Sequence, residues 1–262
     1  MNDFEQRFGG IARLVGAEGL QRLRAAHVCV VGIGGVGSWV VEALARSGVG
    51  ALTLIDLDEV CVTNINRQLH ALDGTVGRAK VAVMAERVRL INPECRVTAV
   101  EEFFTEANAA RLLATDFSYV VDAIDAVGNK SRLLALCVQR ELPVITCGAA
   151  GGRLDATAVL VADLADVSHD RLFAQVRKRL RNKFGLPAAG KPLGIAAVFS
   201  SETPVQPEPP DCAEDIGDAP PQKLNCEWGH GSATFVTGTF GFAAAGWVVR
   251  RIAGAGSSSV SA

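Results

Sequence analysis

Alternation of apolar runs with helix-like segments between residues 27 and 147 restricts the fold of this chain more than any other feature. The apolar runs are HVCVVG, ALTLID, CRVTAVEE, FSYVVDAID and LPVITCG, and segments with helical periodicity separate them. Short runs with few polar residues are typical of parallel strands, which are buried on both faces. The alternation therefore predicts an α/β fold with a doubly wound, Rossmann-like and mostly parallel sheet.

The remainder of the chain predicts further parts around this core. ATAVLVAD and IAAVFS resemble additional strands, DRLFAQVRKRLRNKFG resembles a basic helix, and six prolines between residues 203 and 225 indicate a mobile loop. The expected parts are an N-terminal helical segment (1–26, with a helix at 18–26), a core (27–165), a C-terminal extension with a strand and helices (166–253) and a disordered tail (254–262).

Composition excludes several classes of protein. With 262 residues, of which 49% are hydrophobic, the chain is long enough to bury a sizeable core. A net charge of −2 does not indicate a general nucleic-acid binder, and none of the seven cysteines forms a Cys-x-x-Cys pair typical of a zinc clip. The odd number of cysteines and their wide spacing argue against a disulfide framework. These features predict a reducing, cytoplasmic environment.

Residues 228–249 contain no Asp, Glu, Lys or Arg and are followed by Arg250 and Arg251. On length alone this stretch could span a bilayer. It also contains five glycines and a histidine, and a helix buried across a sheet has the same composition. Because the other segments resemble a soluble α/β enzyme, we expect a buried helix here.

The sequence VVGIGGVGS follows the first predicted strand and opens a helix. It places Gly32, Gly34 and Gly37 in a G-x-G-x-x-G frame, which lets the backbone approach a phosphate at a helix N-terminus. Asp56 lies 19 residues after Gly37, at the end of the next predicted strand, where a carboxylate can bind ribose hydroxyls. These residues alone are compatible with NAD, FAD or ATP, or with a turn that binds nothing.

The loop after Asp56 favours ATP. Arg67, in NINRQ, and Lys80 are cations for which a dehydrogenase has no evident need. An enzyme that promotes attack on the α-phosphate needs positive charge at the phosphorus and at the departing pyrophosphate. Asp125, at the end of the fourth predicted strand, can hold Mg²⁺ on the phosphates. Seen singly, Arg67 or Lys80 could be ordinary solvated cations, but the combination predicts adenylation of a carboxylate.

At GIGGVGS, Asp56, NINRQ, Lys80 and the DAID motif ending in Asp125, the chain resembles the ubiquitin-activating-enzyme-like superfamily of adenylating enzymes. The resemblance implies that ATP binds at the glycine turn, that cations and Mg²⁺ meet its phosphates, and that the protein is a homodimer. It also implies that an N-terminal arginine, Arg13 or Arg7, reaches the ATP of the partner subunit. Ala126 stands where many members of the superfamily have Asn.

Further segments extend the resemblance over almost the whole chain, namely RFGGIARLVG, VCVTNINRQLHAL, INPECRV, FSSET and ATFVTGTFGF. With them the sequence resembles the bacterial tRNA threonylcarbamoyladenosine dehydratases of this superfamily. That family resemblance implies that the threonyl carboxylate on an adenosine beside the anticodon is adenylated and then cyclised, with release of pyrophosphate and AMP. Because the second nucleophile belongs to the substrate, no catalytic cysteine is required.

The expected site therefore combines the glycine turn, the loop and two later side chains. We expect Arg67, Lys80 and Asp125 to be catalytic, with Asp125 also the metal ligand. The expected nucleotide contacts are Gly32, Gly34, Gly35, Gly37, Asp56, Asp58, Asn64, Asn66, Arg67, Gln68, Lys80, Asp125 and Arg13. The alternatives are an adenylyltransferase that acts on a ubiquitin-like sulfur carrier, a domain that binds nucleotide structurally, and a nicotinamide dehydrogenase.

Other residues permit more than one interpretation. Cys226 is a possible sulfur acceptor for a cysteine-desulfurase system, as the resemblance suggests, or an incidental thiol. Lys130 could meet phosphate or complete a charge network, His70 could orient the loop or be structural, and the glycines at 148, 151 and 152 could admit substrate or form a turn. Cys29, Cys137 and Cys147 fit the core. A possible tRNA patch, which could equally be a solvated helix face, contains Arg171, Arg177, Lys178, Arg179, Arg181 and Lys183.

Overall fold

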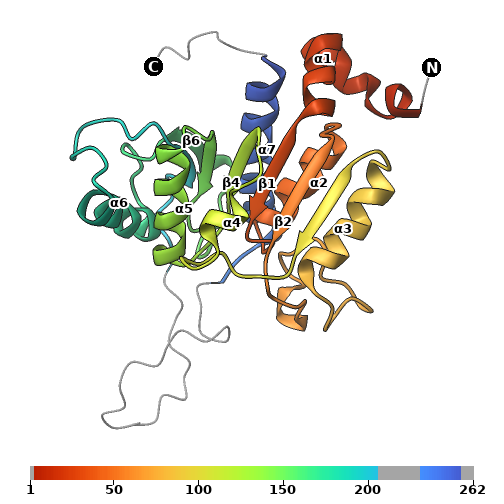
Figure 1. Ribbon diagram of the computed structural model, residues 1–262. Helices are drawn as coiled ribbons and strands as arrows, with labels where there is room; N and C mark the ends of the chain where they lie inside the picture. The colour runs from red at the N-terminus through yellow and green to blue at the C-terminus, as the bar shows by residue number, and fades with distance from the viewer. Residues whose placement is uncertain (1–2, 206–230, 255–262) are drawn as a thin grey trace, which may run out of the picture.

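The computed structural model describes residues 3–205 and 231–254, and within them seven strands form one sheet in the order β3-β2-β1-β4-β5-β7-β6 (Figure 1). Adjacent strands are parallel except for the β6–β7 pair, which is antiparallel. This confirms the predicted, mostly parallel α/β sheet. The strands are β1 (His27–Val31), β2 (Ala51–Ile55), β3 (Arg96–Val100), β4 (Tyr119–Asp122), β5 (Val144–Cys147), β6 (Val159–Asp163) and β7 (Ala196–Ser200).

Helices cover both faces of the sheet, as expected of a doubly wound fold. On one face Val40 of α2, Val88 of α3 and Phe240 of α7 join a single buried cluster, and on the other face Leu134 of α5 and Phe173 of α6 belong to a second cluster. The helices are α1 (Asp3–Ala25), α2 (Gly37–Arg46), α3 (Lys80–Ile91), α4 (Ala109–Leu112), α5 (Val127–Gln139), α6 (Arg171–Phe184) and α7 (Thr234–Ala253), with 3₁₀ turns η1 (Val62–Asn64) and η2 (Ala156–Ala158).

The strand order reverses at β1, because the chain continues to β2 on one side of it and to β4 on the other. In a parallel sheet such a reversal leaves a crevice beyond the carboxyl ends of the two strands, and ligands bind there. The glycine turn between β1 and α2 lies at this crevice. The predicted C-terminal extension belongs to the same sheet, since β7 lies between β5 and β6.

The predicted helix at 18–26 was too short, because α1 extends from Asp3 to Ala25. Glycines in its first half lower helix propensity, and Gly16 interrupts the helix with a φ of 78°. Tertiary packing outweighs this preference, because Phe4, Phe8 and Leu20 bury one another. Helix α3 begins at Lys80 and not at Gly77, since Gly77 adopts a φ of 82° and donates its N–H to the carbonyl of Val60.

The apolar stretch predicted at 228–249 contains most of α7, which packs against α2, α1 and the sheet. Its Phe240, Ala244 and Val248 are fully buried. In the part of the chain that the structure describes, no helix has the length and apolar character needed to cross a membrane. The residues predicted to form the mobile loop from 206 onward, the thiol of Cys226 and the tail after Gly254 lie outside the described residues.

Candidate active site

The glycine turn contains glycines of two kinds. A Cβ atom on Gly37 would lie 1.8 Å from the carbonyl oxygen of Gly32, and one on Gly32 would lie 2.8 Å from the carbonyl oxygen of Ala123. The turn itself therefore requires these two glycines. Gly34 differs, because a Cβ there would meet nothing closer than the amide nitrogen of Gln68 at 3.9 Å. Contacts with the described residues do not explain why position 34 lacks a side chain.

Asp56 connects the turn to β2. Its carboxylate is buried and accepts the backbone N–H of Ile33 at 2.6 Å and that of Asp58 at 2.9 Å. Burial raises the pKa of this carboxyl, whereas the two backbone donors and the charge of Lys80 partly offset the rise. Each oxygen keeps a second lone pair, so the carboxylate can still accept hydrogen bonds from a ligand.

Lys80 is the first residue of α3, and its ammonium lies 2.8 Å from the carboxylate of Asp58. The Lys80 side chain is only 6% exposed, whereas that of Asp58 is 51% exposed. A buried ammonium needs such a partner because removing it from water is costly. The backbone N–H of Lys80 also donates to the carbonyl of Asp58, which holds the start of α3 beside the end of β2.

The NINRQ loop begins at the last residue of η1, and its side chains differ in exposure. Buried Asn64 accepts the N–H of Cys61 and stabilises the loop from inside. Exposed Asn66 donates to the carbonyl of Ser232 at 2.8 Å. The guanidinium of Arg67 donates to the carbonyl of Thr63 at 2.8 Å and to the side-chain oxygen of Asn66 at 3.0 Å. Both bonds use one terminal nitrogen, which leaves the other donors of Arg67 available.

Gln68 and His70 are buried polar side chains with unsatisfied atoms. The amide oxygen of Gln68 and both ring nitrogens of His70 lack hydrogen-bond partners in the described part of the protein. Burial, aided by the charge of Lys80, lowers the pKa of His70 to about 4, so its ring is neutral at pH 7. The buried position agrees with the structural interpretation of His70.

Asp125 lies three residues beyond the end of β4, and not within the strand as predicted. Its side chain is exposed and makes no hydrogen bond or ion pair with the described residues. Beneath it, fully buried Lys130 contacts the carboxylate of Asp122 at 2.9 Å and the carbonyl of Ile124 at 2.8 Å. Lys130 therefore belongs to a charge network, and its ammonium does not face the crevice.

Arg13 and Arg7 lie on α1, at the edge of the sheet opposite the glycine turn (Figure 1). Arg7 is paired with Asp3 at 2.6 Å and also donates to the carbonyl of Ile91. Arg13 is exposed and has no such partner among the described residues. Neither arginine can reach the crevice of its own chain, because the whole sheet separates them from it.

The basic helix α6 is only partly a free charged surface. The guanidinium of Arg177 donates to the carbonyls of Leu164 and Val167, and that of Arg181 donates to the carbonyl of Pro187. Burial lowers the pKa of Arg177, and nearby Arg181 lowers it further. Lys178 and Lys183 are exposed, whereas Arg179 is half-buried.

The predicted core cysteines are buried, and burial raises the pKa of both Cys137 and Cys147 to about 12. Cys29 is buried as well, and its pKa is also raised. Their thiols are therefore protonated and unreactive at neutral pH. No group of three or more His, Cys, Asp or Glu side chains arranged for a metal ion occurs within residues 3–205 and 231–254.

Two features near the crevice escaped the sequence interpretation. Arg153 is 2% exposed and donates to the carbonyls of Ala149, His169 and Ser200, and also to that of Glu202, so it joins three segments beyond the strand ends. Trp39 donates its indole N–H to the carbonyl of Arg67 at 3.2 Å. An isolated arginine or tryptophan carries no motif, so the sequence held no signal for either role.

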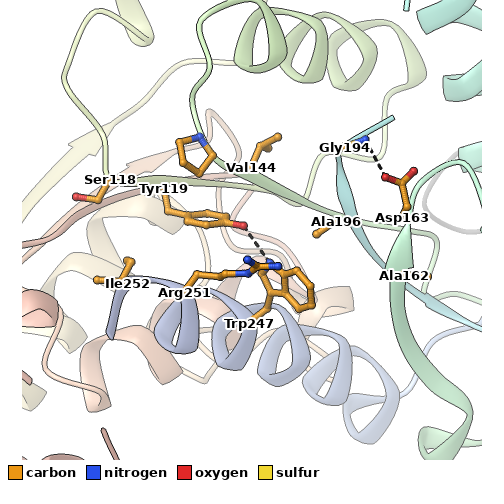
Figure 2. A pocket seen from close by; sticks show the side chains of 11 residues that line it. Ser118, Tyr119, Val144, Ala162, Asp163, Gly194, Ala196, Trp247, Arg251 and Ile252 are labelled. Atoms are coloured by element: carbon orange, nitrogen blue, oxygen red, sulfur yellow. Dashed lines mark hydrogen bonds between the residues drawn. The ribbon is translucent and has the colours of Figure 1, made fainter. Parts of the chain in front are cut away.

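A cavity of about 740 Å³ opens at the edge of the sheet away from the glycine turn (Figure 2). Tyr119, Val144 and Ala196, which line it, are the first residues of β4, β5 and β7. Trp247 and Arg251 of α7 close its other side, and the indole N–H of Trp247 lies 3.0 Å from the hydroxyl of Tyr119. This cavity is therefore separate from the crevice at the carboxyl ends of the strands.

Comparison with known proteins places this site in context. A model of the ThiF family matches residues 10–262. The chain is 50% identical to the tRNA threonylcarbamoyladenosine dehydratase of Escherichia coli, covering 95% of this chain and 94% of the relative. It is 37% identical to the dehydratase of the same name from Bacillus subtilis, with 90% of each chain covered. The molybdopterin-synthase adenylyltransferase of E. coli is 36% identical over 49% of this chain and 51% of its own length.

Solved structures agree with the sequence comparison. The E. coli tRNA N6-threonylcarbamoyladenosine dehydratase in complex with ATP superimposes with a TM-score of 0.86 at 48% identity, covering 96% of both chains. The same enzyme in complex with AMP gives the same TM-score. The family resemblance stated from the sequence motifs is thereby confirmed. The chain belongs to the ThiF family, and the relatives that it matches over at least 90% of both chains include the tRNA threonylcarbamoyladenosine dehydratases of E. coli and B. subtilis.

Proposed function

We propose that this protein is an ATP-dependent tRNA threonylcarbamoyladenosine dehydratase. It adenylates the threonyl carboxylate of N6-threonylcarbamoyladenosine beside the anticodon and closes that group into a ring. The observation that carries the proposal is one juxtaposition at the strand reversal. The glycine turn after β1, the Asp56–Lys80 region after β2 and Asp125 after β4 follow the carboxyl ends of adjacent strands. Full-length similarity to the E. coli enzyme, solved with ATP, supports the choice of nucleotide and substrate.

Nucleotide binding follows from the turn and the end of β2. A phosphate beside Gly34 would meet backbone N–H groups at the start of α2, which no described side chain caps. The lone pairs left on Asp56 are available to the ribose hydroxyls. Asn64 shapes its loop by accepting the N–H of Cys61 and remains an expected nucleotide contact. The amide oxygen of Gln68 is unsatisfied among the described residues, and its amide nitrogen faces Gly34.

In the first chemical step a carboxylate oxygen of the substrate attacks the α-phosphorus and pyrophosphate departs. Arg67 stabilises the charge that develops in this step through the donors it does not use within its loop. Lys80 is held by half-exposed Asp58 until a phosphate competes for its ammonium. Both cations thus serve the transition state, and their positions beside the turn support this assignment.

Magnesium fits the site through Asp125. Mg²⁺ is commonly bound by one or two carboxylates together with substrate phosphates, and it neutralises phosphate charge when bound. Asp125 is exposed and makes no bond with the described residues, so its carboxylate is free to act as such a ligand. Lys130 and Asp122 hold the turn that carries it.

In the second step an atom of the carbamoyl group attacks the activated carbonyl, the ring closes and AMP departs. The net change in the nucleoside is the loss of one water molecule. Proximity within the substrate supplies most of the acceleration, so no protein nucleophile is needed. The three core cysteines, with protonated and buried thiols, are consistent with this chemistry.

A homodimer completes the site in this proposal. Arg13 is exposed, has no ion-pair partner among the described residues and lies at the edge opposite its own crevice, so it can serve only the nucleotide of a partner subunit. Arg7 is the weaker candidate because it is already paired with Asp3.

The tRNA reaches the site from the cytoplasm and contacts α6 mainly through Lys178 and Lys183, which are exposed. Arg177, Arg179 and Arg181 contribute less, since they are half-buried and two of them are bound to backbone carbonyls. The sulfur-acceptor role of Cys226 stays a prediction, because that residue lies outside the described part of the chain.

The experiment offers two substrates in parallel. The protein is incubated with ATP, Mg²⁺ and tRNA that carries threonylcarbamoyladenosine, and the nucleosides are analysed by mass spectrometry. We expect a nucleoside lighter by one water and an equal amount of AMP, and we expect Arg67→Ala or Lys80→Ala to remove both while the fold persists. AMP formed only with a ubiquitin-like carrier protein would refute the proposal in favour of an adenylyltransferase, which the half-length match also permits.

A further inference from the structure

Helix α7 approaches α2 so closely that only glycine fits at the crossing. A Cβ on Gly241 would lie 2.6 Å from the Cβ of Trp39 and 2.8 Å from the carbonyl oxygen of Val36. Gly238 faces the ring of Trp39, with 3.8 Å between its ideal Cβ and the indole. Gly241 thus lets α7 approach the first turn of α2, which carries Trp39 directly after the glycine turn, and Gly238 lies over the indole at an ordinary contact distance.

The indole of Trp39 reaches the NINRQ loop. Trp39 donates its N–H to the backbone carbonyl of Arg67 at 3.2 Å, and its ring packs edge-on against Phe242 with 5.7 Å between centroids. The hydroxyl of Thr237 lies 3.4 Å from the same carbonyl and 3.3 Å from the carbonyl of Thr234. Since a hydroxyl has one proton, the indole is the more constant donor to Arg67.

The preceding residue of the loop is attached to the same helix end. Asn66 donates to the carbonyl of Ser232 at 2.8 Å, and the hydroxyl of Thr234 donates to the carbonyl of Asn66. Residues 66 and 67 are therefore held by α2 and by the start of α7. The glycine turn and Arg67 must contact the same triphosphate. Trp39, which follows the turn in α2, links the two directly through its hydrogen bond to the carbonyl of Arg67.

We propose that Trp39, supported by Thr237, is a positioning residue that holds Arg67 in register with the glycine turn. The inference rests on the proposed function, in which Arg67 stabilises charge on the phosphates. A misplaced guanidinium loses transition-state stabilisation first, because geometry matters most where charge develops. Ground-state binding of ATP depends on the backbone of the turn and on Asp56, and the indole N–H of Trp39 donates to neither of them. Loss of the indole N–H therefore lowers kcat and leaves the KM for ATP almost unchanged.

The test compares Trp39→Phe with Trp247→Phe. Each change removes one indole N–H and keeps an aromatic ring, but the bond lost in Trp247→Phe goes to Tyr119 at the opposite edge of the sheet (Figure 2). We expect Trp39→Phe to lower kcat for AMP release by about tenfold, with KM for ATP within about twofold, and Trp247→Phe to match the wild type. Equal kcat in the two variants would overturn the inference.

A double-mutant cycle separates positioning from general destabilisation. Arg67→Lys keeps a charge, and hence measurable turnover, but loses the guanidinium geometry. If Trp39 acts through Arg67, Trp39→Phe lowers kcat much less in the Arg67→Lys background than in the wild type. The same fold-change in both backgrounds would overturn the inference. Should Trp39→Phe fail to fold, Thr237→Val gives the same comparison in milder form, with Thr237→Ser expected to restore activity.

One readout needs no turnover. Amide hydrogen exchange at residues 64–69 is expected to accelerate several-fold in Trp39→Phe and to stay unchanged in Trp247→Phe. Unchanged exchange in both variants would refute the proposal that Trp39 holds the NINRQ loop. A wild-type protein inactive on the modified tRNA would instead refute the proposed function, and the exchange measurement would still decide whether Trp39 holds the loop.

Discussion

Lys80 and Asp125 have opposite charges at the crevice, and they differ in burial. The ammonium of Lys80 is almost fully buried and therefore paired with Asp58, whereas the exposed carboxylate of Asp125 has no partner among the described residues. Water can solvate Asp125 until a cation and phosphates arrive, but nothing except a protein carboxylate can stabilise buried Lys80 before then. Burial thus decides which charged group is held in advance and which is left free.

His70 predicts how stability depends on pH. Its folded pKa of about 4 lies below the ordinary value of 6.5, so the unfolded chain binds a proton over a range where the folded protein does not. Stability that is present above pH 6.5 is therefore lost as the pH falls toward 4, by up to about 3 kcal/mol. Urea unfolding at pH 7 and pH 5 measures the part of this loss that falls between those two pH values.

His70→Phe is the matched variant, because it removes the titrating group and retains an aromatic ring. The pKa of His27 is lowered as well, mainly by burial, so some pH dependence persists in the variant. We expect the decline between pH 7 and pH 5 to be clearly smaller for His70→Phe than for the wild type. Parallel pH curves for the two proteins would contradict the assignment to His70.

At the scale of elements, the glycine turn before α2 contains glycines that the fold requires and one that the described contacts do not require. Gly32 and Gly37 are glycines because the turn folds back on itself and against the β4–α5 connection. Among the described residues Gly34 has room for a methyl group, so we relate its lack of a side chain to what approaches from outside. Two kinds of glycine within one motif should therefore respond differently to the same substitution.

Gly37→Ala and Gly34→Ala test that distinction. The Gly37 variant would place a Cβ against backbone at 1.8 Å, and we expect it to lose about 2 kcal/mol of stability or more. The Gly34 variant should unfold within about 0.5 kcal/mol of the wild type while its Kd for ATP rises about tenfold or more. Thermal unfolding and calorimetric titration with ATP supply the two values. Wild-type affinity in a folded Gly34→Ala protein would contradict a close approach of phosphate there.

At the scale of the whole molecule, the sheet separates the proposed site from helix α1. Its carboxyl edge holds the glycine turn and the cations, and its amino edge holds α1 with Arg13 (Figure 1). A chain cannot fold Arg13 around to its own crevice without dismantling α1, which packs against α7 and donates from Arg22 to the carbonyl of Ala253. An arginine on this edge can contribute to catalysis only between subunits.

Mixing two inactive variants tests this arrangement. Arg13→Ala and Arg67→Ala should each abolish adenylation in homodimers. In a mixed dimer one of the two sites combines an intact Arg67 with the intact Arg13 of its partner, so random exchange of subunits should restore about a quarter of wild-type activity. The control is a mixture of Arg67→Ala and Lys80→Ala. Both of these residues belong to the site of one subunit, so neither site of a mixed dimer is intact and no recovery is expected. Full activity of Arg13→Ala alone would rule out the role of Arg13.

The sequence predicted much of the proposed site because its residues directly follow predicted strands. Strand ends in a parallel sheet share one edge, so placing Gly32, Asp56 and Asp125 after apolar runs was sufficient to bring them together. The sequence did not predict the direction in which a side chain points. Lys130, one helical turn after Asp125, points inward to Asp122, and Arg177 in the predicted basic patch is bound to carbonyls of its own chain.

By itself, then, the sequence determined the α/β class, the order of the elements and the residues at the strand reversal, because apolar periodicity and glycine geometry act over short distances. Only the tertiary structure decided that α7 crosses α2 at Gly241, that Trp39 reaches Arg67, and that Asp58 holds Lys80. These contacts join residues far apart along the chain, and they depend on how helices pack across the sheet. Packing of that kind leaves no local pattern from which it could be predicted.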